Sequence, residues 1–464
     1  MKKSYFIGLS SFCLILLLSS FTMSDAPTRQ KMMAFLGLEP YLPELPYSYK
    51  VKIPDYLVDG YFWVEQNQSY IENGISDKKA TLGRVLFYDK ILSADNKVSC
   101  GSCHQQAHGF ADNKPFSEGV FGQQTFRNAP NINDLFWKLD YEPANIPLFW
   151  DARANNLHEM LLMPIINAQE MGMYEIGIPN KLENTTYYPA LFEDAFGEPG
   201  IDVEKLKEAL KHFVRSMNTF DSKYDRVKNN DDEFTAAEAA GEQVFNTHCN
   251  TCHTAPLFSV FTPILNGFPI GSDLGFGALS ELPADSGKFK SPSLRNVMAT
   301  APYMHNGSFS TLEEVLQFYS DEIEFPFEVY YGSTGQPIDG SFNMTDDEIQ
   351  NLTAFLGTLT SNNLLTHPKW SDPFVEPSSI KYSVLPNQID VFPNPFSKST
   401  TINLENPNAE TFKIRIVSLN GQVMKEFTSN GKSVDLERGN LVDGAYMLEI
   451  SKENQMKTVR LIVQ

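Results

Sequence analysis

One five-residue pattern, which occurs twice, constrains this chain more than any other feature. The pattern Cys-x-x-Cys-His occurs as Cys100, Cys103 and His104, and again as Cys249, Cys252 and His253. A pair spaced in this way can form a disulfide, act as a redox dithiol, hold zinc or attach haem. Zinc hairpins usually join their pairs over a short loop, and a disulfide gives no reason for the histidine. Covalent haem explains every member, because two thioethers and one iron ligand come from a single turn. The sequence therefore predicts two haem c groups.

Length and charge narrow the class of protein. A chain of 464 residues is too long for one ordinary core, so we expect two or three folded units. Lys and Arg total 37 and Asp and Glu total 57, which gives a formal net charge of -20. This balance argues against nucleic acid as a partner and suits a cationic redox partner.

The N-terminus has the pattern of an export signal. Lys2 and Lys3 precede an apolar run over residues 5–18, and small polar residues follow it. A membrane anchor is the alternative, but the run is shorter than the roughly 20 residues of a spanning helix. We expect a signal peptide over residues 1–25, which also removes Cys13. The mature protein is then periplasmic, on the cell surface or extracellular.

The predicted secondary structure changes once along the rest of the chain, from helices to β-strands. Residues 235–248 predict a helix that begins with a Thr235/Glu238 capping box and leads into the second motif, and residues 80–88 predict a helix before the first. Beyond 365 the pattern turns to a linker and then to β-strands. The predicted fold class is mainly α, with two cytochrome c-like haem domains followed by a small all-β sandwich. The predicted segments are an extension (26–75), haem domains (76–230 and 231–365), a linker (366–384) and the sandwich (385–464).

Residues from about 76 to 360 resemble the bacterial di-haem cytochrome c peroxidase family. The matching stretches include "LGRVLFYDKILS", "PLFWDARANNLHEMLLMPIINAQEMG" and "FKSPSLRNVMATAPYMHNGSFSTLEEVLQFY". The resemblance implies that hydrogen peroxide is reduced at the His104 haem. Electrons would arrive through the His253 haem from a small cytochrome c or cupredoxin. Two alternatives stay open, a peroxide-driven di-haem oxidase of a protein or organic substrate and a non-catalytic multihaem electron carrier.

The resemblance also implies roles for single residues. It places Trp150 between the haems and gives Glu170 the acid-base role above the first iron, where one carboxylate can move the peroxide proton. Taken alone, Trp150 would more often be a core aromatic and Glu170 a surface charge. Arg127, Arg153 and Arg295 are expected to pair with haem propionates, since guanidinium suits carboxylates.

A calcium ion between the haem domains is a further implication of the resemblance. The matching positions are Asn128 and the backbone carbonyls of Thr300 and Pro302, and neutral oxygen donors suit this ion. His305 follows the same stretch and fits the family pattern. His212 falls between apolar stripe positions, and we expect it at the surface.

Two departures from the family bear on the first haem. Many members close the resting iron with a histidine in the loop after the first motif, but residues 115–126 contain Val120 and no histidine. We therefore expect an iron site that is open at rest. His108 lies so close to His104 that it could hardly reach the opposite haem face. Met160 stands where the family usually has a polar residue, and it could pack the pocket or weakly ligate iron.

The second haem differs from the family at its sixth ligand. The family generally has a methionine fourteen residues beyond the position of His305, and this chain has Tyr319 there. The helical pattern of residues 311–320 points Tyr319 toward the core. It could be an ordinary buried tyrosine, but the spacing favours ligation of iron. A phenolate would favour ferric iron and lower the potential.

The last 80 residues resemble a second family. The stretches "DVFPNPF", "LNGQ", "DGAYMLEI" and "TVRLIVQ" are similar to the C-terminal sorting domain of the Bacteroidetes type IX secretion system. This implies that the domain is an address read by the secretion machinery. The alternative is a sandwich that binds carbohydrate or protein.

Overall fold

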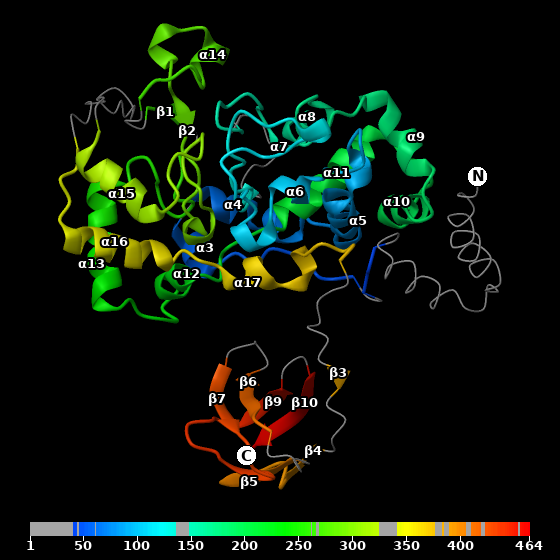
Figure 1. Ribbon diagram of the computed structural model, residues 1–464, viewed down its shortest axis with the longest axis vertical. Coiled ribbons are helices and arrows are strands. Elements are labelled where there is room, and N and C mark those ends of the chain that lie inside the picture. Colours follow the sequence, from blue (N-terminus) through cyan, green and yellow to red (C-terminus); the bar gives the residue numbers. More distant parts are fainter. Residues whose placement is uncertain are drawn as a thin grey trace, which may run out of the picture. The chain divides into compact units, whose positions relative to one another are not determined.

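The chain divides into a helical unit that ends at Pro377 and a β unit that begins at Ser378. This computed structural model (Figure 1) describes residues 40–43, 46–60, 62–135, 148–260, 262–265, 269–323, 341–375, 383–384, 389–404, 410–418, 423–452 and 455–464. The predicted signal peptide at 1–25, with Cys13, lies outside these residues. A mostly helical region followed by a β domain confirms the predicted fold class.

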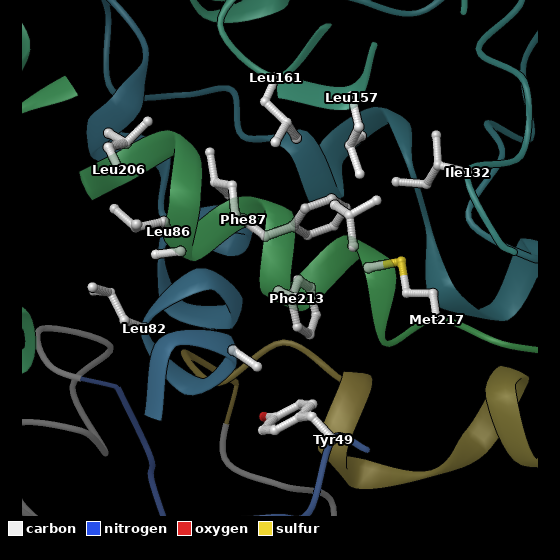
Figure 2. Close-up of a cluster of buried hydrophobic side chains, with 14 of the residues drawn as sticks. Tyr49, Leu82, Leu86, Phe87, Ile132, Leu157, Leu161, Leu206, Phe213 and Met217 are labelled. Carbon is white, nitrogen blue, oxygen red and sulfur yellow. The ribbon is translucent and has the colours of Figure 1, made fainter. Parts of the chain in front are cut away.

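The first haem domain is built on a helix pair. Helix α5 (Asp77–Tyr88) packs against α11 (Val203–Arg215). Gly83 permits the close approach, because a Cβ at this position would lie 2.0 Å from the carbonyl oxygen of Ala209. Figure 2 shows the side chains that meet there, and the ring centroids of Phe87 and Phe213 are 5.3 Å apart. This core forms one wall beside the first motif.

The second haem domain repeats the arrangement. Helix α13 (Ala236–His248) packs against α16 (Asp346–Gly357), as Figure 1 shows. Here Gly241 is at the crossing, since a Cβ would lie 1.9 Å from the carbonyl oxygen of Asn351. The predicted capping box is confirmed: the Glu238 N–H donates to Thr235 Oγ1 at 3.3 Å, and the Glu238 side chain accepts from the Thr235 N–H at 2.7 Å.

Shorter helices and turns surround these two pairs. The α-helices are α3 (Asp55–Gly60), α4 (Phe62–Asn73), α6 (Cys100–Cys103), α7 (Leu157–Met160), α8 (Met163–Ile166), α9 (Ile178–Glu183), α10 (Tyr188–Phe196), α12 (Lys223–Lys228), α14 (Gly277–Ser280), α15 (Leu312–Asp321) and α17 (Asn362–Thr366). The short 3-10 helices are η2 (Lys90–Leu92), η3 (Gln106–His108), η4 (Val120–Gly122), η6 (Glu175–Gly177), η7 (Pro283–Asp285), η8 (Val297–Ala299) and η9 (Pro368–Trp370), and β1 (Pro263–Ile264) pairs with β2 (Phe289–Lys290). Within the described part of the chain, we find no helix that has both the length and the apolar character needed to cross a bilayer.

Two expectations about this unit were wrong. The linker predicted over 366–384 begins too early, because Trp370 is 1% exposed in the first core and its indole N–H donates to Ser216 Oγ at 3.1 Å. His212 is buried and not at the surface. Its Nδ1 accepts from the Ser76 N–H at 3.2 Å and its Nε2 lies 3.1 Å from Glu208. A charged neighbour on the helix and a backbone donor satisfy a ring that periodicity alone assigned to solvent.

The β unit is a sandwich of two sheets around one core. The larger sheet has the order β3 (Ser383–Val384), β10 (Gln455–Val463), β9 (Gly444–Lys452), β6 (Phe412–Ser418) and β7 (Val423–Ser429). The smaller has the order β4 (Ile389–Phe392), β5 (Ser399–Leu404) and β8 (Ser433–Glu437). Alternate side chains such as Ile402, Leu448 and Leu461 are buried between them.

Asp225 joins three parts of the helical unit. Its carboxylate accepts from both terminal nitrogens of Arg295 at 2.9 and 2.8 Å and from the Tyr56 hydroxyl at 2.7 Å. Asp225 and Arg295 are 2% and 0% exposed. Burial alone would raise the pKa of Asp225, but Arg295 lowers it below its ordinary value. The pair therefore joins α12, the 295 loop and the N-terminal extension.

We predict that Asp225→Asn will destabilise the haem-loaded protein by about 3–5 kcal/mol, because it leaves a buried guanidinium without its counter-charge. Urea unfolding followed by circular dichroism measures the loss. Asp194→Asn is the matched control, since Asp194 forms an exposed ion pair with Lys78 that should contribute less than about 1 kcal/mol. Equal losses in the two variants would contradict this account.

Candidate functional site

The first Cys-x-x-Cys-His motif forms a single turn. Cys100 and Cys103 span α6, and the His104 N–H donates to the Cys100 carbonyl at 2.8 Å. His104 Nδ1 is 2.8 Å from the carbonyl oxygen of Phe110. Because a carbonyl only accepts, Nδ1 carries the proton and Nε2 keeps a lone pair for a metal. The turn thus presents two thiols and one ring nitrogen.

The second motif has the same geometry. The His253 N–H donates to the Cys249 carbonyl at 2.9 Å, directly after α13. His253 Nδ1 lies 3.1 Å from the Phe258 carbonyl oxygen and 3.2 Å from that of Pro292. Burial lowers the pKa of His253 to about 4, so the ring is neutral at pH 7 and can ligate iron.

The rival uses of the cysteines fit poorly. The structure joins neither pair as a disulfide. Burial raises the pKa of Cys100 and of Cys249 to about 12, whereas a redox dithiol needs a lowered thiol pKa. In the described residues no three His, Cys, Asp or Glu side chains are grouped to hold a metal ion. Haem attachment accounts for the arrangement best.

Each motif opens into its own cavity. A cavity of about 640 Å³ is lined by Cys103 and His104, together with Glu170, Met160 and Arg153. A second, of about 160 Å³, is lined by Cys249, Cys252, His253, His305 and Tyr319. Thiols, a neutral histidine and a mixed apolar and polar wall in one cavity fit a haem c. The residues present therefore suit one haem at each motif.

Trp150 lies between the two cavities and lines both of them. Its indole N–H donates to the Asn128 carbonyl at 2.8 Å, and its own carbonyl accepts from the Lys290 N–H at 2.7 Å. The first bond holds the ring from the first haem domain, and the second bonds the Trp150 backbone to the second haem domain. The structure thus brings Trp150 to the position that the resemblance implied.

Glu170 faces the first cavity with His104. Burial raises its pKa, although the charge of Arg153 opposes the shift. The Asn167 side-chain amide donates to Glu170 Oε1 at 2.9 Å and orients the carboxyl group. The fully buried Val120 donates its backbone N–H to the Glu170 carbonyl at 2.9 Å, so the loop that lacks a histidine supports the Glu170 segment.

The three arginines that were expected to pair with haem propionates lie in two different places. Arg127 and Arg153 line the first cavity and both pair with Asp151, at 2.6 and 3.0 Å. Arg127 also pairs with Asp273 at 2.6 Å. Arg295 lines neither cavity, and its guanidinium is engaged by Asp225. The expectation that Arg295 pairs with a propionate is therefore corrected, because that donor pair is already used in the core.

The positions implied for calcium come together at the second cavity. Asn128, Thr300 and Pro302 all line it. The Asn128 amide nitrogen donates to the Lys114 carbonyl at 2.9 Å, which leaves its side-chain oxygen as an acceptor. His305 lies beside them, and its backbone carbonyl accepts from the backbone N–H of Asn128 at 2.7 Å.

Tyr319 also reaches the second cavity, from α15. Burial raises its pKa, and the nearby Cys252 and Cys249 raise it further. The structure therefore brings Tyr319 and His253 into one cavity. The periodicity of residues 311–320 was sufficient to predict the inward direction of this side chain.

Sequence reasoning missed Lys290. Its side chain lines both cavities beside Trp150, and its Nζ donates to the Ser291 carbonyl at 3.2 Å. Burial lowers its pKa to about 8. A half-buried cation that lines both cavities suits a haem propionate. The one available signal was a lysine directly before the "SPSLRN" stretch.

Comparisons with known families agree with this geometry. The family model for di-haem cytochrome c peroxidase matches residues 77–233, and a RoxA-like, cytochrome c-like model matches residues 288–322. The model for the secretion system C-terminal sorting domain matches residues 390–464. The last match indicates export to the cell surface or the extracellular space.

Individual relatives cover most of the helical unit. The methylamine utilization protein MauG of Methylophilus methylotrophus is 30% identical over 259 residues, which is 54% of this chain and 75% of the relative. The cytochrome c551 peroxidase of Nitrosomonas europaea is 28% identical over 310 residues, or 65% of this chain and 84% of the relative. A crystal structure of a MauG-like protein associated with microbial copper homeostasis is 30% identical, covers 72% of this chain and 98% of its own, and has a TM-score of 0.56. Two c-type haems are implied, and the chain belongs to the di-haem cytochrome c peroxidase and MauG family, with a C-terminal secretion sorting domain.

Proposed function

We propose that the protein is an exported di-haem cytochrome c peroxidase that reduces hydrogen peroxide to water at the first cavity. The observation that carries this proposal is that Glu170 and His104 face one cavity, while Trp150 lines that cavity and the next. Cys100, Cys103 and His104 would hold a haem, which would supply the iron for peroxide reduction.

The residues in and around the first cavity have different roles in this proposal. Glu170 takes a proton from one peroxide oxygen and delivers it to the other, and its raised pKa brings it closer to the range of an effective acid-base group. Asn167 holds the carboxyl in place. Val120 is buried away from the cavity, which leaves room for peroxide without a displacing loop movement.

Cys249, Cys252 and His253 would hold the second haem, which would supply electrons to this cavity, and Trp150 lies on the route between them. The Trp150 ring is bonded to the first domain and its backbone to the second, which supports a position preorganised for transfer. The external donor is a small cytochrome c or cupredoxin, since the chain's charge of -20 attracts a cationic partner. A calcium ion at Asn128, Thr300 and Pro302 is part of the same proposal, supported by their shared position at the second cavity.

One observation favours a second function, the peroxide-driven oxidation of a protein or organic substrate. Tyr319 shares a cavity with His253, and an oxygen ligand would lower the potential of that haem. A second haem that is hard to reduce suits the storage of oxidising equivalents better than simple relay. A non-catalytic carrier is less well supported, because it gives Glu170 no role.

The first prediction from the proposed function concerns haem content. The full-length protein should carry two covalent haems, and the Cys100→Ala, Cys103→Ala double variant should keep only one, because each motif attaches its own haem. Intact mass and the pyridine haemochrome spectrum measure this. The equivalent double variant at Cys249 and Cys252 is the control. One haem or none in the parent protein would refute the assignment.

The second prediction concerns Glu170. Glu170→Gln should leave both haems in place and lower the peroxidase rate by about 10² or more, as expected for loss of an acid-base group. Stopped-flow mixing with peroxide measures the rate. Glu193→Gln, at an exposed position on α10, should leave the rate unchanged. Parent activity in Glu170→Gln would move the acid-base role elsewhere.

The third prediction concerns Tyr319. Tyr319→Phe should change the resting spectrum of the second haem and raise its potential, because an electron-rich oxygen ligand is lost. Tyr303→Phe is the matched control, since Tyr303 lines the same cavity but donates its hydroxyl to the Val297 carbonyl. Unchanged coordination in Tyr319→Phe would return the protein to an ordinary relay at the second haem.

A further inference from the structure

A pair of tyrosines shares one carboxylate oxygen beside the first motif. Asp89 directly follows α5, and its Oδ1 accepts from the Ile91 N–H at 2.9 Å. Its Oδ2 accepts from the Tyr188 hydroxyl at 2.9 Å and from the Tyr187 hydroxyl at 2.5 Å. The two ring centroids are 4.6 Å apart. None of the roles assigned above uses this cluster.

The cluster runs from the wall of the first motif toward the surface. Tyr188 is fully buried and Asp89 is 8% exposed, whereas Tyr187 is half-buried. Tyr88, the residue before Asp89, packs against Gly101 within the motif, because a Cβ at Gly101 would lie 2.4 Å from Tyr88 Cδ1. The Cys100 thiol is near enough to raise the pKa of Tyr188, although burial and Asp89 contribute more.

The partner of each phenol decides what it can do. A phenol that loses an electron near neutral pH must also lose its proton, so it needs a base within hydrogen-bond distance. Tyr88 donates to the Trp370 carbonyl at 2.6 Å, which is too weak a base. Tyr56 donates to Asp225, but Arg295 lowers the pKa of that carboxyl against the effect of burial. Asp89 instead lies within hydrogen-bond distance of two phenols, and Lys181, the nearby cation whose charge interacts with Asp89, donates its Nζ to the Ser93 carbonyl at 2.7 Å. The Asp89 carboxylate is therefore the base that both phenols share.

We propose that Tyr188, Tyr187 and Asp89 form a proton-coupled relay through which small phenolic one-electron donors at the surface reduce the first haem after peroxide has oxidised it. The proposal rests on the peroxidase function above and adds a second electron route that bypasses the second haem. A neutral phenol is the donor class because a chain of charge -20 disfavours anionic reductants.

Each step balances. Tyr188 gives one electron to the oxidised haem while its O–H bond breaks and its proton moves to Asp89 Oδ2. Tyr187 then reduces Tyr188: the proton on Asp89 returns to Tyr188, and the proton of Tyr187 takes its place on Asp89. A phenolic donor at the surface gives one electron to Tyr187, which recovers its proton from Asp89. The donor's own proton leaves to solvent.

The test uses the haem-loaded full chain and one equivalent of peroxide. Freeze-quench electron paramagnetic resonance should detect a tyrosyl radical in the parent protein that Tyr188→Phe loses. Tyr187→Phe should keep the radical but slow the oxidation of guaiacol, a simple phenol, by about tenfold or more, as loss of a proton-coupled step does. Turnover driven by a reduced cytochrome should be unchanged in both variants.

Tyr174→Phe is the matched control, since Tyr174 is an 85% exposed tyrosine of the same domain outside the cluster. It should match the parent protein in every measurement. If Tyr188→Phe loses haem, Tyr187→Phe decides alone, because its half-buried ring loses only a hydroxyl.

The two proposals fail in different ways. A parent protein whose haem spectrum does not respond to peroxide overturns both the peroxidase function and the relay. A parent protein that responds, but whose radical and guaiacol rate persist in haem-replete Tyr188→Phe and Tyr187→Phe, overturns the relay alone.

Discussion

The indole of Trp150 donates to the Asn128 carbonyl at 2.8 Å, and this contact holds the ring where it lines both cavities of the helical unit. The main-chain carbonyl of Trp150 accepts from the Lys290 N–H at 2.7 Å, so the Trp150 backbone is bonded to the second haem domain and its ring to the first. Because the bonds are to main-chain atoms, the position follows from the fold and not from a particular rotamer of a neighbour.

A buried ion pair links other segments of the same helical unit. The Asp225–Arg295 pair is almost free of solvent and joins the second domain to the N-terminal extension through Tyr56. Arg127 and Arg153 instead remain at the cavity wall, where Asp151 orients them. The same residue type therefore serves the core in one place and the ligand cavity in another. The burial of the carboxylate partner distinguishes the two cases, since Asp225 is 2% exposed and Asp151 is 15% exposed.

Local features of this fold could be predicted because they depend on neighbours in the sequence. The capping box at Thr235, the inward face of residues 311–320 and the β pattern of the last 80 residues all follow from short-range periodicity. His212 and the start of the linker could not be predicted in the same way. Ser76 satisfies His212, and the first core buries Trp370, and both contacts join segments far apart in the chain.

The sequence by itself determined the two haem attachment sites, since thioether and histidine ligands come from one turn whose chemistry is complete within five residues. Only the tertiary structure decided that Nδ1 of each motif histidine carries the proton, since Nδ1 faces a carbonyl. It also decided that Trp150 and Lys290 line both cavities and that Arg295 is used in the core. It also brought Tyr187 and Tyr188 to Asp89, almost 100 residues earlier in the chain. Burial and hydrogen-bond partners depend on how distant segments pack, and no spacing rule within one segment contains that information.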